Sequence, residues 1–397
     1  MSHIFNFKKN YFYYFFIIFF ISGFYFSLNT GITHDEYFEL YVSEINKKTF
    51  LNLLLGFNYF FDPLEGLGLF YGSGFHYFSA PIEFILNFII TNKYTTQETN
   101  KLLFKHPSVF ILFTISGIYF RKIIFYITKD INYSNLTTFF YLTYPYLLGH
   151  SFFNVKDVPF LSVWLINTFF IIKICDYFYE NKKVNYTDFS ILAILTAYLL
   201  SIRISGVLIL IQYGVFFITT LNILNYKVFK FIKSFTKAIF LFLFLLLFFF
   251  YLLNPSYWSN PLNFIDAILS MSQHIQTVCT ITLGECMKAQ NLPSSYIPIW
   301  LFFKLPILIL FGILLFIVNE KKIFSSNTNK FSLGSIIISS LLIIFLLIFL
   351  NINLYDEIRQ IMFLIPLILI VSFTGLFYIK RKLSYSFVIF FIIFFIF

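Results

Sequence analysis

Charge is scarce in this sequence. Asp, Glu, Lys and Arg supply 12% of its 397 residues, whereas hydrophobic residues supply 59% and the mean hydropathy is +0.82. A chain so poor in charge leaves no room for a large soluble domain. Its net charge is +10, but the basic residues are scattered between apolar runs. That distribution argues against nucleic-acid binding, which needs basic residues grouped on one surface.

Cysteine and histidine are also rare, with three and six residues. No C-x-x-C, Cys/His or H-x-x-x-H spacing occurs, so the common zinc-site patterns are excluded. Cys175 lies in an apolar run and is interpreted as a small buried hydrophobic residue. Cys279 and Cys286 share one loop, where they either form a disulfide in an oxidising compartment or remain two free thiols.

Long apolar runs are what the chain has in abundance. They predict an all-α polytopic membrane protein, a single transmembrane domain over 1–397 with about 11 transmembrane helices. The first run follows Lys8 and Lys9 and lacks a small-residue cleavage site, so it is interpreted as an uncleaved helix. The predicted spans are 11–28, 105–127, 135–152, 157–175, 188–201, 203–222, 236–253, 298–318, 331–350, 358–379 and 383–397.

The loops between these spans alternate in charge. Most of the 28 basic residues fall in one set of loops, including the clusters at 227–237, 321–330 and 380–382, while most acidic residues fall in the other set. Positive charge marks the cytoplasmic side of short loops. We therefore predict a cytoplasmic N-terminus in a bacterial inner membrane, with two large external loops at 29–104 and 254–297.

Two segments leave a choice of topology. Residues 75–92 are apolar enough to span, but a span there would invert every later loop, so we interpret them as a re-entrant or interfacial helix in the first external loop. The stretch 188–222 could be one helix with Arg203 in the middle of the membrane. A lone arginine in lipid is costly, which favours two helices that turn at Arg203.

Polar clusters recur on the predicted external side. Two adjacent carboxylates, which are costly at a membrane surface if idle, follow the first span. The glycines of 66–74 are interpreted as turn residues, with a phosphate cradle as the alternative. Tyr257 and Trp258 suit an interfacial turn. The external polar residues are His34, Asp35, Glu36, His150, Asn154, Lys156, Asp157, Arg203, Tyr296, Lys304, Asp356 and Arg359.

This mixture favours one chemistry. His150 and Ser151 lack an oxyanion-hole signature, which argues against hydrolysis by a nucleophilic serine. A carboxylate base together with dispersed cations suits group transfer from a phosphorylated lipid. The alternative is that these cations are ion-paired residues without a ligand, since Lys156 adjoins Asp157 and Arg359 lies near Asp356. A divalent metal on His34, Asp35, Glu36 and His150 stays open.

The ordered motifs resemble bacterial GT-C superfamily glycosyltransferases of the protein O-mannosyltransferase-like kind (family 39-like). Residues 150–160, HSFFNVKDVPF, are similar to the motif H-S-F-x-N-P-K-D-x-P-F, and 254–261, NPSYWSNP, to P-x-x-W-x-N-P. Residues 292–306 resemble an L-P-x-x-Y-x-P-x-W stretch, and 355–360, YDEIRQ, resemble Y-D-G-W-R-H. Val155 replaces a proline, and Glu357, Ile358 and Gln360 replace Gly, Trp and His.

The resemblance implies inverting sugar transfer from a polyprenyl-phosphate donor to a hydroxyl of a glycan, lipid or protein on the periplasmic face. It implies that Asp35 is the general base and that Glu36 holds the acceptor or a metal. His34, Tyr257, Trp258 and Tyr296 are assigned to the acceptor or to the membrane interface. It further implies that the external loop residues His150, Asn154, Lys156, Asp157, Arg203, Lys304, Asp356 and Arg359 bind the donor, and that the first loop forms an acceptor groove with interfacial helices. The alternatives are a transporter or flippase of lipid-linked sugars and a non-catalytic relative.

Overall fold

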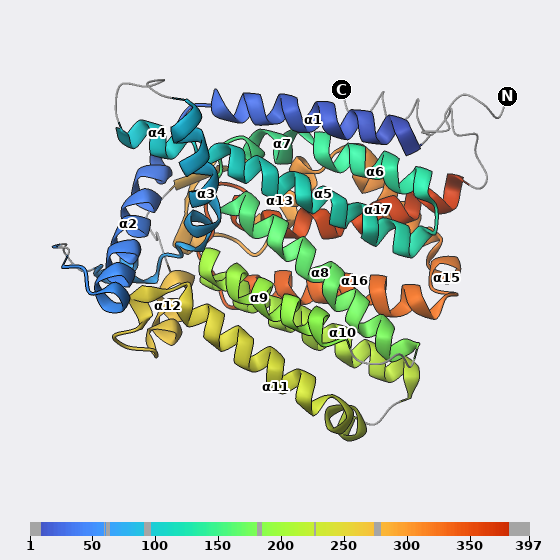
Figure 1. The fold of residues 1–397 in the computed structure, drawn as a ribbon. Coiled ribbons are helices and arrows are strands. Elements are labelled where there is room, and N and C mark those ends of the chain that lie inside the picture. The colour runs from blue at the N-terminus through green and yellow to red at the C-terminus, as the bar shows by residue number, and fades with distance from the viewer. Residues whose placement is uncertain are drawn as a thin grey trace.

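Nearly all of the secondary structure is helical in the computed structural model. It describes residues 9–58, 60, 64–90, 97–180, 185–225, 228–273 and 279–380. The long helices run side by side as one bundle, with shorter elements gathered at one end (Figure 1). The last predicted span, 383–397, lies outside the described residues.

Within the described residues, seven helices are long and apolar enough to cross a bilayer, or up to eight if one bent pair counts as a span. The chain is thus a multi-pass membrane protein, but the predicted number of eleven spans is not confirmed. Some of these stretches join a short turn to the main helix. The main helices are α1 (Lys9–Leu28), α5 (His106–Thr128), α8 (Asp157–Tyr179), α10 (Ile209–Leu224), α11 (Val228–Leu252), α16 (Asn327–Phe349) and α17 (Ile365–Lys380).

Prolines divide two of the predicted spans. The run 135–152 becomes α6 (Ile131–Thr143) and α7 (Pro145–Ser151), and 298–318 becomes α13 (Tyr296–Lys304) and α14 (Ile307–Val318). The second pair is bent by 110° at Leu305 and Pro306. Proline has no N–H to donate and disfavours a helical conformation in the preceding residue, so each helix ends there.

The predicted turn at Arg203 is present. Helix α9 (Tyr186–Ile202) ends there, Arg203 is extended at φ −146° and ψ 132°, and η2 (Ile204–Leu208) leads into α10. Helix α9, with 17 residues, is apolar but shorter than the spans counted above. The break brings the guanidinium to the end of a helix instead of its middle.

The first loop folds into helices at one end of the bundle. Helix α2 (His34–Leu55) crosses that end (Figure 1), and α3 (Gly74–Ile89) contains Pro81 and is not among the candidate spans. The loop also holds η1 (Gly66–Phe70) and α4 (Gln97–Leu103). Helices in this loop were expected, and they put the start of α2 beside the ends of the long helices.

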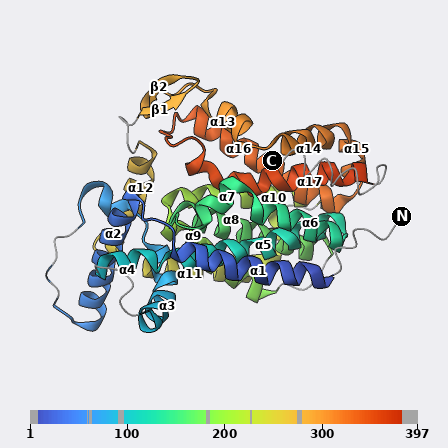
Figure 2. The same ribbon diagram turned by 90° about the horizontal axis from the view of Figure 1, so that it is seen from above.

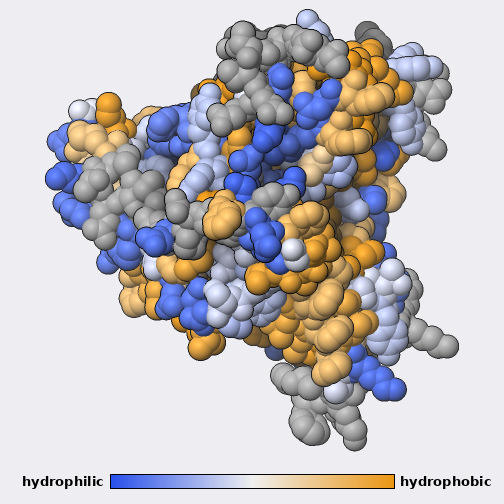
Figure 3. Space-filling view, turned by 60° about the vertical axis from the view of Figure 1, so that its left-hand side comes forward, coloured by the Kyte–Doolittle hydropathy of each residue, from blue (hydrophilic) through white to orange (hydrophobic). Residues whose placement is uncertain are grey.

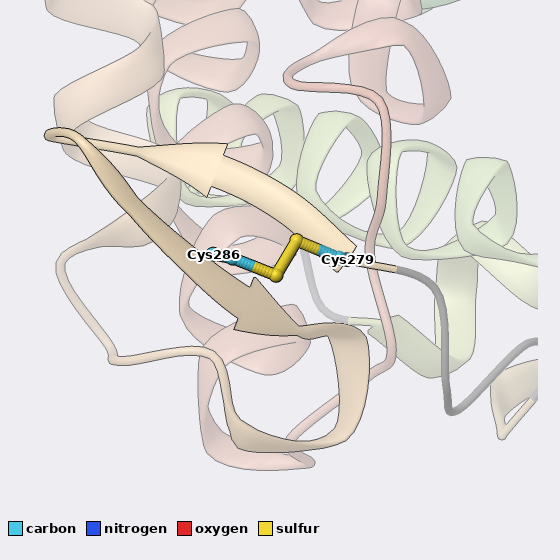
Figure 4. Close-up of a disulfide and its surroundings, with 2 residues drawn as sticks. All are labelled: Cys279 and Cys286. Carbon is cyan, nitrogen blue, oxygen red and sulfur yellow. A yellow bond between two sulfur atoms is a disulfide. The ribbon is translucent and has the colours of Figure 1, made fainter.

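The second loop contains the only two strands in the described part of the chain. Strand β1 (Cys279–Thr282) pairs antiparallel with β2 (Glu285–Lys288), and Cys279 forms a disulfide with Cys286 (Figure 4). Figure 2 shows this hairpin toward the same end as α2. The shorter elements of the remaining chain are η3 (Pro255–Tyr257), α12 (Asn263–Ser272), η4 (Ala289–Asn291), α15 (Glu320–Ile323) and η5 (Arg359–Leu364).

Helix α8 is the centre of the core and the most buried of the candidate spans. Its Trp164 packs on Phe363 with ring centroids 4.2 Å apart, and Phe120 stacks on Tyr141 at 4.6 Å. Such aromatic pairs stabilise a core beyond simple burial. Cys175 of α8 is buried and unpaired, as predicted. Because α8 is fixed on all sides, the residues at its N-terminus have a rigid support.

Candidate active site

The N-terminal end of α8 meets α2, Tyr71, the α9–η2 turn and the start of η5 in a polar pocket of about 400 Å³. Figure 3 turns this end toward the viewer and shows hydrophilic residues gathered on it, with hydrophobic residues along the bundle flank. Five segments far apart in the sequence supply the lining. It consists of Thr33, Asp35, Glu36, Glu39, Tyr71, Phe153, Asn154, Val155, Lys156, Asp157, Arg203 and Arg359.

A capping arrangement fixes the start of α2. The Glu36 carboxylate accepts hydrogen bonds from the backbone N–H of Thr33 at 2.7 Å and from its hydroxyl at 2.9 Å. These contacts satisfy groups at the helix N-terminus that the helix itself leaves unpaired. Asp35 therefore lies in the first turn, with a side chain that is 56% exposed.

Glu36 has a different environment from its neighbour. Its side chain is 2% exposed, and Oε2 lies 2.7 Å from Nε2 of the buried His106 on α5. Both carboxylate oxygens thus have partners inside the protein. The contact with His106 joins α2 to α5, and Glu36 also contributes to the lining of the polar pocket.

Arg359 links three carboxylates. Its Nη2 lies 2.9 Å from Oδ2 of Asp35, its Nε lies 3.1 Å from Oδ2 of Asp157, and its Nη1 lies 3.2 Å from Oδ2 of Asp356. The predicted pairing of Arg359 with Asp356 is therefore present, but it is one of three. The planar guanidinium holds Asp35 at a fixed place in the pocket.

Asp157 joins two arginines in the first turn of α8. Its Oδ1 lies 2.6 Å from Nη2 of Arg203, while Oδ2 contacts Arg359. Asn154 organises this turn, because its Oδ1 accepts from the backbone N–H groups of Lys156 at 3.1 Å and Asp157 at 2.7 Å. Its Nδ2 also donates to Asp157 at 3.0 Å. The N-x-K-D segment is thus a side-chain cap that aims both charged residues into the pocket.

Glycine permits a close contact beside Arg203. A Cβ on Gly72 would collide with the backbone carbonyls of Ser201 and Ile202. Only glycine therefore lets the segment around residue 72 lie against the end of α9. The neighbouring Tyr71 is thereby held next to Lys156, whose Nζ lies 3.0 Å from the centroid of the tyrosine ring. The interpretation of the 66–74 glycines as turn residues misses this packing role.

Lys156 lies in a buried polar environment. Its Nζ is 2.9 Å from Oε1 of Glu39, a buried carboxylate one helical turn after Asp35. Burial lowers the pKa of Lys156 to about 8, although Glu39 opposes that shift. Burial also raises the pKa of Tyr71 well above its usual range, and the Glu39 charge adds to this effect. The expected pairing of Lys156 with Asp157 is replaced by a pairing with Glu39.

A second, more apolar pocket of about 770 Å³ adjoins the first and shares Tyr71, Lys156 and Arg203 with it. The cations therefore lie between the Asp35 carboxylate and an apolar cavity. The buried Nε of Arg203 has no hydrogen-bond partner in the described structure. Apolar side chains from five elements dominate the lining, among them Phe70, Leu208, Met271, Leu347, Ile361 and Phe363.

Lys304 and His150 lie beside the polar pocket and not in its lining. Nζ of Lys304 is 2.5 Å from Oε2 of Glu357, and the lysine lines a separate cavity of about 730 Å³ with Tyr144 and Tyr146. The His150 ring packs on Tyr146 with centroids 4.9 Å apart, and its Nδ1 is 3.4 Å from Nδ2 of Asn154. His150 thus supports the capping asparagine.

The aromatic residues predicted to contact an acceptor have structural partners. Tyr257 is buried against Phe250, and Trp258 donates from Nε1 to the Tyr251 carbonyl at 2.6 Å. Tyr296 is buried and donates to the Glu357 carbonyl at 3.1 Å. These three side chains attach the second loop to α11 and to the segment before η5, and they do not line the polar pocket. His34 is exposed at the start of α2 and is not part of that lining either.

The described residues contain no group of three or more His, Cys, Asp or Glu side chains suited to hold a metal ion. Asp35 contacts Arg359, and Glu36 contacts Thr33 and His106. The open possibility of a metal on Asp35 and Glu36 is thus not matched by this geometry.

Sequence reasoning missed Glu39, Tyr71 and His106. One signal for Glu39 was available, because a helix starting near Thr33 puts residues 36 and 39 on one buried face. Nothing local marks Tyr71 or His106, since each acquires its partner only through tertiary packing.

No protein-family model matches this chain, and no curated protein matches it.

Proposed function

We propose that this protein is an inverting membrane glycosyltransferase that moves a sugar from a polyprenyl-phosphate donor to an acceptor hydroxyl. The observation that carries the proposal is the adjacency of two pockets across Lys156 and Arg203. One pocket offers a carboxylate that is exposed to an incoming hydroxyl. The other offers apolar walls, and the two cations lie where a phosphate between sugar and prenyl chain would sit.

The donor fits this arrangement part by part. A prenyl chain gains free energy by entering an apolar cavity. A phosphate gains charge-assisted hydrogen bonds from lysine and arginine, and the unpartnered Nε of Arg203 is one such donor. The Asp157 carboxylate keeps Arg203 and Arg359 at fixed positions, so little side-chain ordering is left for substrate binding.

The reaction follows from the positions of base and cations. The acceptor oxygen attacks the anomeric carbon, the bond from that carbon to the phosphate oxygen breaks, and polyprenyl phosphate leaves with the bonding electrons. The acceptor proton passes to the carboxylate of Asp35, which Arg359 orients. Lys156 and Arg203 stabilise the negative charge that grows on the leaving phosphate. A single displacement inverts the anomeric configuration.

The proposed location is the periplasmic face of a bacterial inner membrane, with a cytoplasmic N-terminus. The distribution of basic residues between the loops supports this orientation. The Cys279–Cys286 disulfide lies in a hairpin toward the same end as α2, and disulfides persist in oxidising compartments such as the periplasm.

The test is transfer by purified protein in proteoliposomes. A panel of radiolabelled polyprenyl-phosphate hexoses and pentoses is supplied, and release of polyprenyl phosphate is followed with native membrane extract as the acceptor source. Asp35→Asn should lower the rate about 10²- to 10⁴-fold, the usual contribution of a general base. Glu44→Gln, on the same helix but in an exposed pair with Lys101, is the matched control. Unchanged transfer by Asp35→Asn would overturn the mechanism.

A further inference from the structure

Glu39 is a buried carboxylate that the proposed chemistry leaves unused. It lies one turn after Asp35 on α2, is 4% exposed, and contributes to the lining of the polar pocket. An ionised carboxylate in such a place is costly unless a cation accompanies it. Glu39 therefore needs a cation close to its carboxylate.

Two basic side chains from other elements face Glu39. Oε1 lies 2.9 Å from Nζ of Lys156, and Oε2 lies 3.9 Å from Nε2 of His76 on α3. Burial opposes the charged form of Glu39, but Lys156 and then His76 outweigh it, so the pKa of Glu39 falls below its usual value. Burial lowers the pKa of His76, which leaves Lys156 as the main counter-charge near neutral pH.

Opposing effects set the pKa of Lys156. Burial lowers its pKa to about 8, Arg203 pushes the pKa lower, and Glu39 and Asp157 push it higher. The Tyr71 ring lies on one side of Nζ and makes a cation–π contact that also favours the charged form. Of the carboxylates around Nζ, Glu39 is the one in direct ion-pair contact. Without it, burial and Arg203 would lower the pKa of Lys156 further, toward neutrality of the amine in the physiological pH range.

We propose that Glu39 is a positioning residue that keeps Lys156 protonated and aimed at the junction of the two pockets, ready for an anionic group. The proposal rests on the proposed function for the identity of that group, a donor phosphate. Glu39 touches no reacting atom in this scheme. It acts through Lys156. In many binding sites a carboxylate that does not touch the ligand fixes the orientation and the protonation state of the side chain that does.

The first experiment measures the charge of Lys156 directly. Purified protein in detergent is acetylated with limiting acetic anhydride between pH 6 and pH 10, and the modification of Lys156 is quantified by mass spectrometry. The wild-type midpoint is expected at about 8. Glu39→Gln should lower the midpoint by about one unit or more, the usual effect of removing an opposite charge within contact distance. Glu44→Gln should leave the midpoint unchanged. Glu39→Asp keeps a carboxylate near Lys156, so its midpoint should lie close to that of the wild type.

The second experiment compares pH profiles of transfer in proteoliposomes. For Glu39→Gln the alkaline limb of kcat/KM for the donor should move to lower pH by the same amount, mainly through a higher KM, with activity recovering at pH 6. A purely structural role would lower activity equally at all pH values and leave the labelling midpoint in place. That result would overturn the proposal.

The two readouts separate the proposal from the proposed function. A shifted labelling midpoint in Glu39→Gln supports the role of Glu39 even if no polyprenyl-phosphate sugar is turned over by the wild type, in which case the glycosyltransferase proposal fails alone. An unshifted midpoint overturns the role of Glu39 whether or not transfer is observed.

Discussion

Arg359 and Asp35 are 324 residues apart in sequence, and their side chains meet with Nη2 2.9 Å from Oδ2. The contact joins the start of η5 to the first turn of α2. Residues from the beginning and from the end of the sequence thus meet in one pocket. Arg359 also contacts Asp157, so the proposed base and the N-terminus of α8 are held by the same guanidinium.

Replacing Arg359 should therefore abolish most transfer. Arg359→Gln is expected to lower kcat/KM about 10²- to 10³-fold, a loss comparable to removing one electrostatic donor from an active site. Arg359→Lys should recover little, because an ammonium cannot contact several carboxylates in one plane. Steady-state assays in proteoliposomes check both. Asp356→Asn removes one of the three carboxylates and serves as the milder comparison; equal rates for all variants would contradict the assigned role.

Transfer should decline above about pH 8 in the wild type. Lys156 is charged below its pKa of about 8 and loses its proton as the pH rises through that value, so its hold on a phosphate weakens on the alkaline side. Lys156→Arg carries a charge that persists beyond pH 12. The ratio of rates at pH 9 and pH 7 should therefore rise in this variant. An identical alkaline decline in both proteins would rule out Lys156 as its cause.

The buried pair of Glu36 and His106 should matter for stability more than for chemistry. His106→Phe leaves Oε2 of the buried Glu36 without its partner, while Oε1 keeps its contacts to Thr33, and an unmade buried hydrogen bond typically costs about 1–3 kcal/mol. The double variant Glu36→Gln/His106→Phe should regain part of that loss. Unfolding of the detergent-solubilised protein, followed by thermal melting or denaturant, measures both. If the single variant melts like the wild type, the pair is not what joins α2 to α5.

Gly72→Ala should disturb both stability and activity. The added methyl would meet the carbonyls of Ser201 and Ile202, and over-packing of this kind usually costs about 1–3 kcal/mol. Because Tyr71 and Arg203 adjoin the contact, donor KM should rise as well. Gly334→Ala in α16 is the matched control, since nothing lies within 4 Å of its added Cβ. A neutral Gly72→Ala would show that the two segments can separate without consequence.

Cys279 and Cys286 should resist alkylation until they are reduced. In denatured, non-reduced protein only Cys175 is expected to react, and after reduction all three cysteines should react. Mass spectrometry of the labelled peptides checks this. Alkylation of all three without reduction would place the hairpin in a reducing compartment and argue against the proposed orientation.

Sequence reasoning was most successful where hydrophobicity and the cost of charge act locally. Apolar runs mark membrane helices because backbone groups in lipid must form hydrogen bonds within the helix. The break at Arg203 was predictable because an unpaired guanidinium in the hydrocarbon core costs free energy. It was less successful at Pro145 and Pro306. Each run there is long enough for one span, but a proline divides it into two helices.

The amino-acid sequence by itself determined a multi-pass helical protein with polar residues in its loops, because these properties depend on composition along the chain. Only the tertiary structure decided what adjacent residues do. Asp35 and Glu36 differ by one step around α2, about a quarter of a turn, which exposes one carboxylate to the pocket and buries the other against α5. The partner of Lys156 was likewise decided by packing: Glu39 lies more than a hundred residues away, yet folding brings it closer than the adjacent Asp157.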